Sequence, residues 1–406
     1  MAVPDVLQML QNLTPQQRRD LLLGFGKQDL ARLSSMSGQE LLRLVTDAPS
    51  PAPAAPKKST RWFDRPLCGL SKEGKERLHD LEMQVRLPAS SARADLKLFR
   101  YLKQLNKMHL TVPDFFRSAL SPREFYHSLT DFCRDNDIPD QFAQRLVPIL
   151  VTYIQTGHMR PVLIVGEKGC GKTTAVRLLL EKALQLPVEV IKVPQTDGSH
   201  GLTGDNGSYQ DADAGSLAKG RLRAGRLLLV YLFDEIDKAS RNLTRASVDD
   251  QLLSITDESC DSVYDNYLGT TLVGLEYCPK FMTANDLQMV SPILADRCTV
   301  IRFPNADAAR IKSIARKYVD KQLSNELYSL IRFDYGLMDA HIERLVRQGV
   351  TSLRQHQQMI EEVLEAALHV ALSQTTEEIV PVTEPMFLAA ETALLGTNRH
   401  RTGFMR

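Results

Sequence analysis

Several features that mark particular classes of protein are missing from this sequence of 406 residues. The longest apolar run, Leu227–Phe233, is far too short to cross a bilayer. The first 23 residues lack the basic and apolar segments of a secretory signal. The six cysteines form no CxxC pair and no metal-ligand spacing, which is typical of reduced thiols in a cytosolic protein. We therefore expect a cytoplasmic protein without membrane association.

A charge bias is missing as well. The net charge is +1, so nothing in the overall charge favours nucleic acid or an anionic membrane as a partner. What is present is an ordinary globular composition, with 43% hydrophobic and 24% charged residues. The length is enough for about two to three domains.

Composition and periodicity divide the chain into six segments. The stretch DAPSPAPAAPKKST, at residues 47–60, is rich in proline and alanine and is typical of an extended linker. The residues before it predict short helices, which form either an adaptor or self-association module or a helical cap on the main body. The predicted segments are an N-terminal helical module at 1–47, the linker at 48–61, a helical domain at 62–140, an α/β nucleotide-binding domain at 141–304, a helical lid at 305–396 and a tail at 397–406.

The most informative stretch is PVLIVGEKGCGKTTAVR at residues 161–177. An apolar run predicts a buried strand, and the pattern G-x-x-x-x-G-K-[ST] then leads into an amphipathic helix. The glycines let backbone N–H groups turn toward an anion, and the helix N-terminus adds partial positive charge. A glycine loop that merely joins strand to helix is the alternative, but the full pattern favours a nucleoside triphosphate. The predicted binding residues are Gly166, Glu167, Lys168, Gly169, Cys170, Gly171, Lys172, Thr173 and Thr174.

Apolar runs elsewhere predict the rest of a sheet. After the first strand at 162–165, further strands are expected at 187–192, 227–233, 280–283 and 299–303. Strands that alternate with helices indicate a parallel sheet covered on both faces, which is an α/β P-loop fold. From about residue 307 to 390 the pattern is mostly helical, as expected of a separate lid.

Polar residues within and after these strands predict the chemistry. Lys172 should reach the outer phosphates, and the Thr173 hydroxyl should ligate Mg²⁺. Asp234 and Glu235 directly follow LLLVYLF, where Mg²⁺ needs a second anchor and the attacking water needs a general base. Asn285, in FMTAND, can hold that water against the γ-phosphate. For Asp234 and Glu235, the alternative is an acidic loop after a core strand. For Asn285, it is an ordinary turn residue.

Two arginines complete the predicted catalytic set. Arg297, in SPILADRC, can stabilise the charge of the transition state if a neighbouring subunit supplies it, although a surface salt bridge is an alternative. Arg354, in TSLRQHQQMIEEV, begins a lid helix and can couple the lid angle to phosphate occupancy, although a solvated arginine is an alternative. The predicted catalytic residues are Lys172, Asp234, Glu235, Asn285, Arg297 and Arg354.

The motifs GEKGCGKTT, LFDEIDKA, TAND and SPILADRC, with the lid arginine, together resemble an AAA+ ATPase. LFDEIDK, LLSITDESCDSVYDNYL and ARKYVDKQL are also similar to the ATPase module of Lon proteases, over roughly residues 146–395. In the family's Gly-Val-Arg motif, Ser352-Leu353 stand for Gly-Val, and His356 replaces a leucine. The resemblance implies Walker A at 166–173, Walker B at Asp234-Glu235, sensor 1 at Asn285, an arginine finger at Arg297 and sensor 2 at Arg354.

The chain departs from Lon proteases in two ways. It stops at Arg406, straight after the expected lid, so we expect a ring ATPase without the Ser–Lys peptidase domain. Lon-like rings also grip substrate with an aromatic–hydrophobic–glycine loop, whereas the corresponding stretch here is GSHGLTGDNGSYQDADAG. Tyr209 is its aromatic residue, but an acidic, glycine-rich loop grips apolar polypeptide less well. An ordinary loop tyrosine is the alternative role for Tyr209.

The resemblance implies a homo-oligomeric ring, a hexamer as in the family, that uses ATP and Mg²⁺. We expect it to remodel or translocate a polypeptide substrate for a separate partner protein. Two alternatives stay open, a nucleic-acid-dependent AAA+ ATPase and a nucleotide-gated scaffold or sensor that recruits an effector. The near-neutral charge and the acidic loop disfavour nucleic acid.

Overall fold

The computed structural model describes residues 61–86, 95–118, 120–193, 201–205, 212–238, 248–257, 259–374 and 378–402. The predicted N-terminal module at 1–47, the linker up to residue 60 and the predicted pore residue Tyr209 lie outside the described residues.

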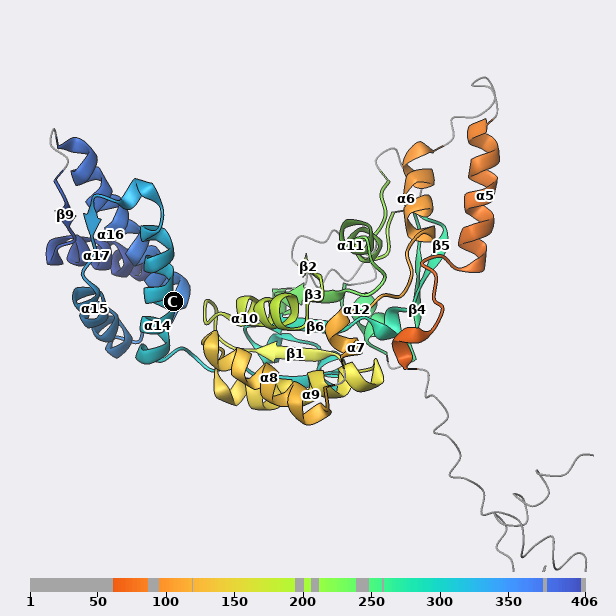
Figure 1. Ribbon diagram of the computed structural model, residues 1–406, viewed down its shortest axis with the longest axis horizontal. Coiled ribbons are helices and arrows are strands. Elements are labelled where there is room, and N and C mark those ends of the chain that lie inside the picture. Colours follow the sequence, from red (N-terminus) through yellow and green to blue (C-terminus); the bar gives the residue numbers. More distant parts are fainter. Residues whose placement is uncertain are drawn as a thin grey trace, which may run out of the picture. The chain divides into compact units, whose positions relative to one another are not determined.

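A sheet of five parallel strands forms the centre of the fold (Figure 1). Each apolar run named above forms one strand, so the predicted α/β class is confirmed. The strand order is β2-β3-β6-β1-β7, which places Val162 of β1 between Phe281 of β6 and Thr299 of β7. The strands are β1 Val162–Val165, β2 Val188–Lys192, β3 Val230–Asp234, β6 Lys280–Ala284 and β7 Thr299–Arg302. The carboxyl ends of β3, β6 and β1 are therefore neighbours at one edge.

Alternate residues of each strand enter two separate cores, one on each face of the sheet. Val162 and Ile164 are buried in the core formed with α8, α9 and α10. Leu163, between them, is buried in the core formed with α6, α11 and α12 on the opposite face. The helices of this part of the chain are α5 Lys72–Arg86, α6 Leu96–Asn106, α7 Asp114–Arg117, α8 Pro122–Asp135, α9 Asp140–Thr156, α10 Lys172–Leu178, α11 Ser216–Ala224, α12 Val248–Thr256 and α13 Pro292–Arg297.

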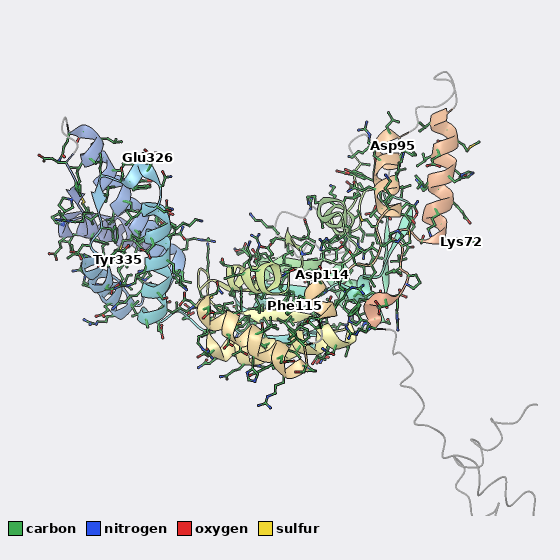
Figure 2. The ribbon with its side chains drawn as sticks, in the orientation of Figure 1. Lys72, Asp95, Asp114, Phe115, Glu326 and Tyr335 are labelled. Carbon is green, nitrogen blue, oxygen red and sulfur yellow. The ribbon has the colours of Figure 1, made fainter. Side chains whose placement is uncertain are left out.

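We call residues 166–173 the phosphate loop. The helical segment before this loop shares both cores with the sheet. Trp62, the single tryptophan, donates from Nε1 to the Ile154 carbonyl at 3.1 Å, and its ring stacks on Tyr277. Farther along, α5 and α6 lie side by side (Figure 1). Figure 2 labels Lys72, the first residue of α5, and Asp95, the N-cap residue that precedes α6. The described residues between 62 and 135 therefore pack as part of the same body as the sheet.

A β-hairpin that the sequence did not predict lies between α12 and β6. Strands β4 Ser262–Asp265 and β5 Thr270–Val273 are antiparallel and pair only with each other within the described residues. The Tyr267 hydroxyl, in the hairpin turn, donates to Asp95 at 2.8 Å. Each strand has four residues, too few for a period-two pattern to stand out from the surrounding loop.

The C-terminal helices, which we call the lid, enclose a core of their own. The lid contains α14 Ala308–Leu323, α15 Tyr335–Arg347, α16 Leu353–Ser373, α17 Glu384–Thr402 and the paired strands β8 Ile331–Arg332 and β9 Val380–Pro381. All members of its apolar core come from residues 306–395. Figure 2 marks Glu326 and Tyr335 in the lid. A helical lid after the sheet agrees with the predicted fold class.

In the part of the chain that the structure describes, no helix is both long enough and apolar enough to cross a membrane.

Candidate nucleotide-binding site

The loop between β1 and α10 depends on two glycines with left-handed backbone. Gly169 has φ +82° and Gly171, the N-cap of α10, has φ +96°. Residues with a Cβ rarely adopt this conformation, so glycine is needed at both positions. The loop delivers the chain into the first turn of α10, where backbone N–H groups without helical partners favour an anion.

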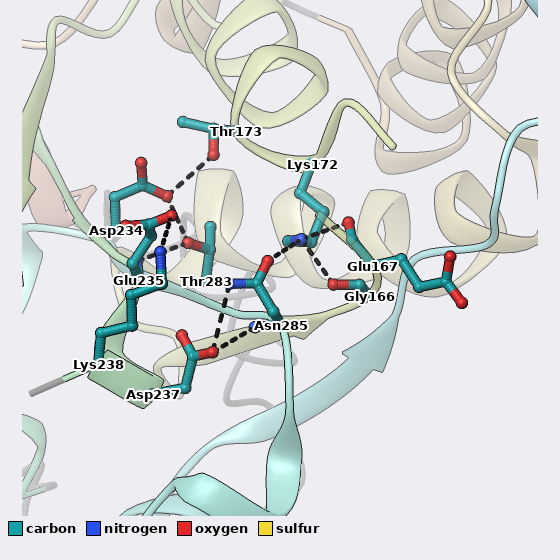
Figure 3. Close-up of polar contacts among 10 residues, drawn as sticks. All are labelled: Gly166, Glu167, Lys172, Thr173, Asp234, Glu235, Asp237, Lys238, Thr283 and Asn285. Atoms are coloured by element: carbon teal, nitrogen blue, oxygen red, sulfur yellow. Dashed lines mark hydrogen bonds and ion pairs between the residues drawn. The ribbon is translucent and has the colours of Figure 1, made fainter. Parts of the chain in front are cut away.

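Lys172, in the first turn of α10, lies at the centre of the site (Figure 3). Its Nζ donates to the carbonyls of Gly166 at 2.6 Å and Glu167 at 2.9 Å, and to Oδ1 of Asn285 at 3.1 Å. Only 7% of the residue is exposed, and burial lowers the pKa of its ammonium group. The structure thus brings the lysine of the loop and the asparagine after β6 into direct contact.

Thr173 and Asp234 place two oxygen atoms side by side. The Thr173 hydroxyl, on α10, donates to Oδ1 of Asp234, at the end of β3, over 3.0 Å (Figure 3). A hydroxyl and a carboxylate next to a phosphate loop are the hard oxygen ligands that Mg²⁺ uses in nucleotide sites. These two residues therefore fit the ion that the ATPase fold implies and would be its protein ligands.

Thr283, which is not among the site residues predicted from the sequence, contacts both Asp234, the last residue of β3, and Glu235, which follows it. Its buried hydroxyl donates to Oδ1 of Asp234 at 2.5 Å and accepts the backbone N–H of Glu235 at 3.1 Å. Thr283 lies on β6 and Asn285 follows that strand directly, two residues later, so in extended backbone both side chains point to the same face. That spacing is the signal by which the sequence could have identified it.

Asp237, also missed, orients the asparagine. Its Oδ2 accepts from the Asn285 backbone N–H at 3.1 Å and from Nδ2 at 3.3 Å. With Nδ2 held by Asp237, Oδ1 of Asn285 faces Lys172. The amide is therefore held from both sides, and its orientation follows from the hydrogen bonds it makes.

Glu235 has an unusual backbone and a cation beside it. Its φ is +59°, a conformation that is rare for residues other than glycine and concentrated at functional sites. Its Oε1 forms an ion pair with Nζ of Lys238 at 2.6 Å across the one-turn helix Ile236–Lys238 (Figure 3). The carboxylate lies at the same sheet edge as Asp234, close to the phosphate loop.

Arg297, at the end of α13, has different surroundings from the residues above. Its guanidinium donates to the Leu253 carbonyl of α12 and lies 3.4 Å from the carboxylate of Asp257. The side chain is about one-third exposed. Within one chain it therefore lies beside α12.

Arg354 is exposed at the start of α16, and its neighbours contact the phosphate loop. The Leu353 N–H donates to the Gly169 carbonyl at 2.9 Å, and a Cβ on Gly169 would overlap the Ser352 hydroxyl. His356 is buried, its Nε2 bonds the Val350 carbonyl at 2.9 Å, and burial lowers its pKa. His356 is therefore a buried residue of the lid.

Comparison with known proteins agrees with this geometry. The profile of the "ATPase family associated with various cellular activities (AAA)" matches residues 162–305. The Lon protease of Methanosphaera stadtmanae is 28% identical over 200 residues, 48% of this chain and 24% of the relative. The Lon protease homolog of Acanthamoeba polyphaga mimivirus is 24% identical over 166 residues, 40% of this chain and 16% of the relative. For the Lon protease of Phenylobacterium zucineum the identity is 26% over 281 residues, 68% of this chain and 34% of the relative.

The matched part of the chain spans between 16% and 34% of the length of these three relatives. The family profile covers the strands from β1 to β7 and includes the phosphate loop and the residues Gly166, Glu167 and Asn285, which accept hydrogen bonds from Lys172. The chain therefore contains an AAA ATPase domain, and part of its length is similar to the ATPase region of Lon proteases.

Proposed function

We propose that this ATPase assembles as a ring of six subunits and remodels or translocates a polypeptide substrate for a separate partner protein. The observation that carries the proposal is the division of the predicted catalytic residues into two groups. The contact pairs Lys172–Asn285 and Thr173–Asp234, which we call the network, lie beside the phosphate loop where β3 and β6 end, whereas Arg297 contacts Leu253 and Asp257. An arginine outside the network fits a role at the nucleotide of a neighbouring subunit.

Each residue of the network has a role in phosphoryl transfer. Lys172 binds the outer phosphates, and the Asn285 amide, held by Asp237, orients a water molecule for in-line attack on the γ-phosphorus. Glu235 accepts the proton of that water as the new P–O bond forms and the bond to ADP breaks. Mg²⁺, held by Thr173 and Asp234, would neutralise charge on the β- and γ-phosphates. Arg297 of the next subunit stabilises the charge on the transferred group.

The substrate class is supported by charge and by the relatives. A net charge of +1 does not favour nucleic acid, and the relatives that match are named Lon proteases. The residues on either side of the predicted pore loop are held together, because the Asp205 N–H donates to the Asp213 carbonyl at 3.0 Å. We assign Tyr209 to the contact with polypeptide and keep the cytoplasm as the predicted location.

The test uses Glu235→Gln in the full chain. The amide cannot accept a proton from water, so we expect kcat to fall by about 100-fold or more. ATP should stay bound, because the contacts to the phosphates are unchanged. Mass photometry and negative-stain imaging with ATP should then show six-membered rings, and an added unfolded protein should occupy their centre.

Lys172→Ala is the control, since it removes the phosphate contact and should abolish both ATP binding and the ring. Rings that form only when single-stranded DNA is added would identify a nucleic-acid-dependent ATPase instead. An ATP-bound monomer that never assembles would leave Arg297 without a role and overturn the ring.

A further inference from the structure

The carbonyl groups of the phosphate loop need partners on the side away from the nucleotide. A loop that points its N–H groups at an anion turns its C=O groups outward, and buried C=O groups require donors. The carbonyls of Gly166 and Glu167 accept hydrogen bonds from Nζ of Lys172, in the first turn of α10. Those of Gly169 and Cys170 receive donors from the lid, at 2.9 Å from the Leu353 N–H and at 3.3 Å from Nη1 of Arg310.

Arg310, in the first turn of α14, is held in place by two further contacts. Its Nε donates to the Asp137 carbonyl at 2.7 Å, in the turn between α8 and α9. Its guanidinium lies over the ring of Phe303, 5.2 Å from the ring centre. One planar group thus bridges the lid, the turn before α9 and the phosphate loop, a geometry that suits the rigid fork of arginine.

The helix that carries Arg310 is anchored to the same turn by two more side chains. Ser313 donates to Oδ1 of Asp137 at 2.7 Å, and Lys317 contacts Oδ2 of Asp137 and the Asp135 carbonyl at 2.6 and 2.7 Å. Positions 310, 313 and 317 lie on one face of α14. Asp137, at the receiving end, has φ +54°, which is rare for a residue with a side chain. These contacts hold α14, and with it the backbone of Arg310, against the turn before α9.

The Cys170 carbonyl matters because it shares a peptide unit with the Gly171 N–H. In a trans peptide the two groups point in opposite directions, and no cis peptide occurs in the described residues. A donor that fixes the carbonyl outward also fixes the Gly171 N–H inward, toward the place of the phosphates. Glycine at 171 leaves this peptide free to rotate unless something restrains it.

We propose that Arg310 is a positioning residue of the ATPase site, which aims the Gly171 N–H at the bound nucleotide by holding the Cys170 carbonyl from behind and so links nucleotide affinity to the position of the lid. The inference rests on the proposed nucleotide site but not on the ring or on the polypeptide substrate. Arg310 thereby differs from Lys172, Arg297 and Arg354, for which the predicted target is the nucleotide itself.

The test compares Arg310→Ala and Arg310→Lys with the full wild-type chain. Loss of a charged hydrogen bond to the loop should weaken binding of a fluorescent ATP analogue about tenfold, mostly through faster dissociation in stopped flow. KM should rise with kcat at saturating ATP almost unchanged, since the interaction serves bound substrate and transition state alike. Lysine cannot bridge the carbonyls of Asp137 and Cys170 at once. The affinity of Arg310→Lys for the analogue should therefore lie between those of wild type and Arg310→Ala.

Arg316→Ala is the matched control. Arg316 lies on the same helix, but it pairs with Asp339 and covers Tyr335, both within the lid. The Arg316→Ala variant should bind the analogue with wild-type affinity. Hydrogen exchange at residues 166–172 should rise in Arg310→Lys and not in Arg316→Ala.

Three outcomes would count against the inference. Wild-type affinity and KM in both Arg310 variants, with the analogue bound normally by wild type, would overturn it and leave the proposed function standing. An equal loss of affinity in Arg316→Ala would show a general effect of lid stability and overturn it too. A wild-type chain that binds no nucleotide would remove the proposed function as well. If circular dichroism shows that Arg310→Ala does not fold, Arg310→Lys decides.

Discussion

The Thr283 hydroxyl connects two residues of the candidate site, Asp234 and Glu235. It donates to the Asp234 carboxylate, a predicted Mg²⁺ ligand, and accepts from the backbone of Glu235, the predicted general base. The residue is 1% exposed, so neither hydrogen bond is exchanged freely for one with water. Its loss would remove the acceptor of the Glu235 N–H and one of the two hydroxyl donors to Oδ1 of Asp234, the other being Thr173.

We therefore expect Thr283→Val, which keeps the shape of the side chain, to lower kcat about tenfold in a steady-state ATPase assay. Thr283→Ser should retain most activity, because the hydroxyl is preserved. The matched control is Thr270→Val, which removes an equally buried hydroxyl that contacts Ser71 and not the site. Equal kcat in Thr283→Val and wild type would show that the hydroxyl does not position the acidic residues.

At the scale of the element, the turn of the β4–β5 hairpin is held together by a buried carboxylate. Asp265 is fully buried and accepts the N–H groups of Leu268 at 2.9 Å and Gly215 at 2.8 Å. Burial raises its pKa to about 6, and the hydrogen bonds to the carboxylate oppose that rise. The hairpin is thereby joined to the start of α11, immediately after the segment that contains Tyr209.

This raised pKa predicts a pH dependence of stability. The folded-state pKa lies above the unfolded value, so the stabilising contribution is present at low pH and is lost as pH rises through about 6. Between pH 5 and pH 7 the free energy of unfolding of the wild-type chain should fall by about 1 kcal/mol relative to that of Asp265→Asn, in which residue 265 does not titrate. The difference in melting temperature between the two chains, measured at several pH values, tests this expectation.

Asp265→Asn also loses one backbone hydrogen bond at every pH. This loss lowers its stability by a constant amount and does not change how the stability difference varies with pH. Asp261→Asn, an exposed change on the same hairpin, is the control for added positive charge. A melting difference between wild type and Asp265→Asn that does not change with pH would contradict the raised pKa.

For the whole molecule, the helical segment before the phosphate loop supplies side chains to the cores on both faces of the sheet. Trp62, Phe125 and Leu129 are buried with α9 and β1, and Leu102 and Leu105 are buried on the opposite face. Contacts of this kind make a helical segment part of the body that it covers. The predicted boundary between residues 140 and 141 stays a prediction that a truncation can test.

A chain that begins at residue 141 should expose the apolar face of α9 and should aggregate or lose its fixed packing, whereas residues 61–406 should fold. Near-UV circular dichroism, soluble yield and binding of the fluorescent ATP analogue compare the two chains. Deletion of a large buried side chain alone costs about 3–5 kcal/mol, and the truncation removes many. A chain from 141 that binds the analogue as tightly as 61–406 would make residue 141 a true domain boundary.

Local patterns in the sequence determined much of this protein. Apolar runs of four to seven residues located the five strands of the sheet, because buried parallel strands need apolar side chains on both faces. The phosphate loop was identifiable because glycines, lysine and threonine act there within a few residues of one another. The polar residues at Asp234, Glu235 and Asn285 were identifiable because they directly follow strands.

Only the tertiary structure decided which distant residues meet. The pairs Thr283 and Asp234, Asn285 and Lys172, and Arg310 and Cys170 are 49, 113 and 140 residues apart in sequence. The first two depend on the order β3-β6-β1, and the third on where α14 rests. The short β4–β5 hairpin also needed its packing against α5 and α6 to be seen. No periodicity encodes such contacts, because they arise from the way whole elements pack together.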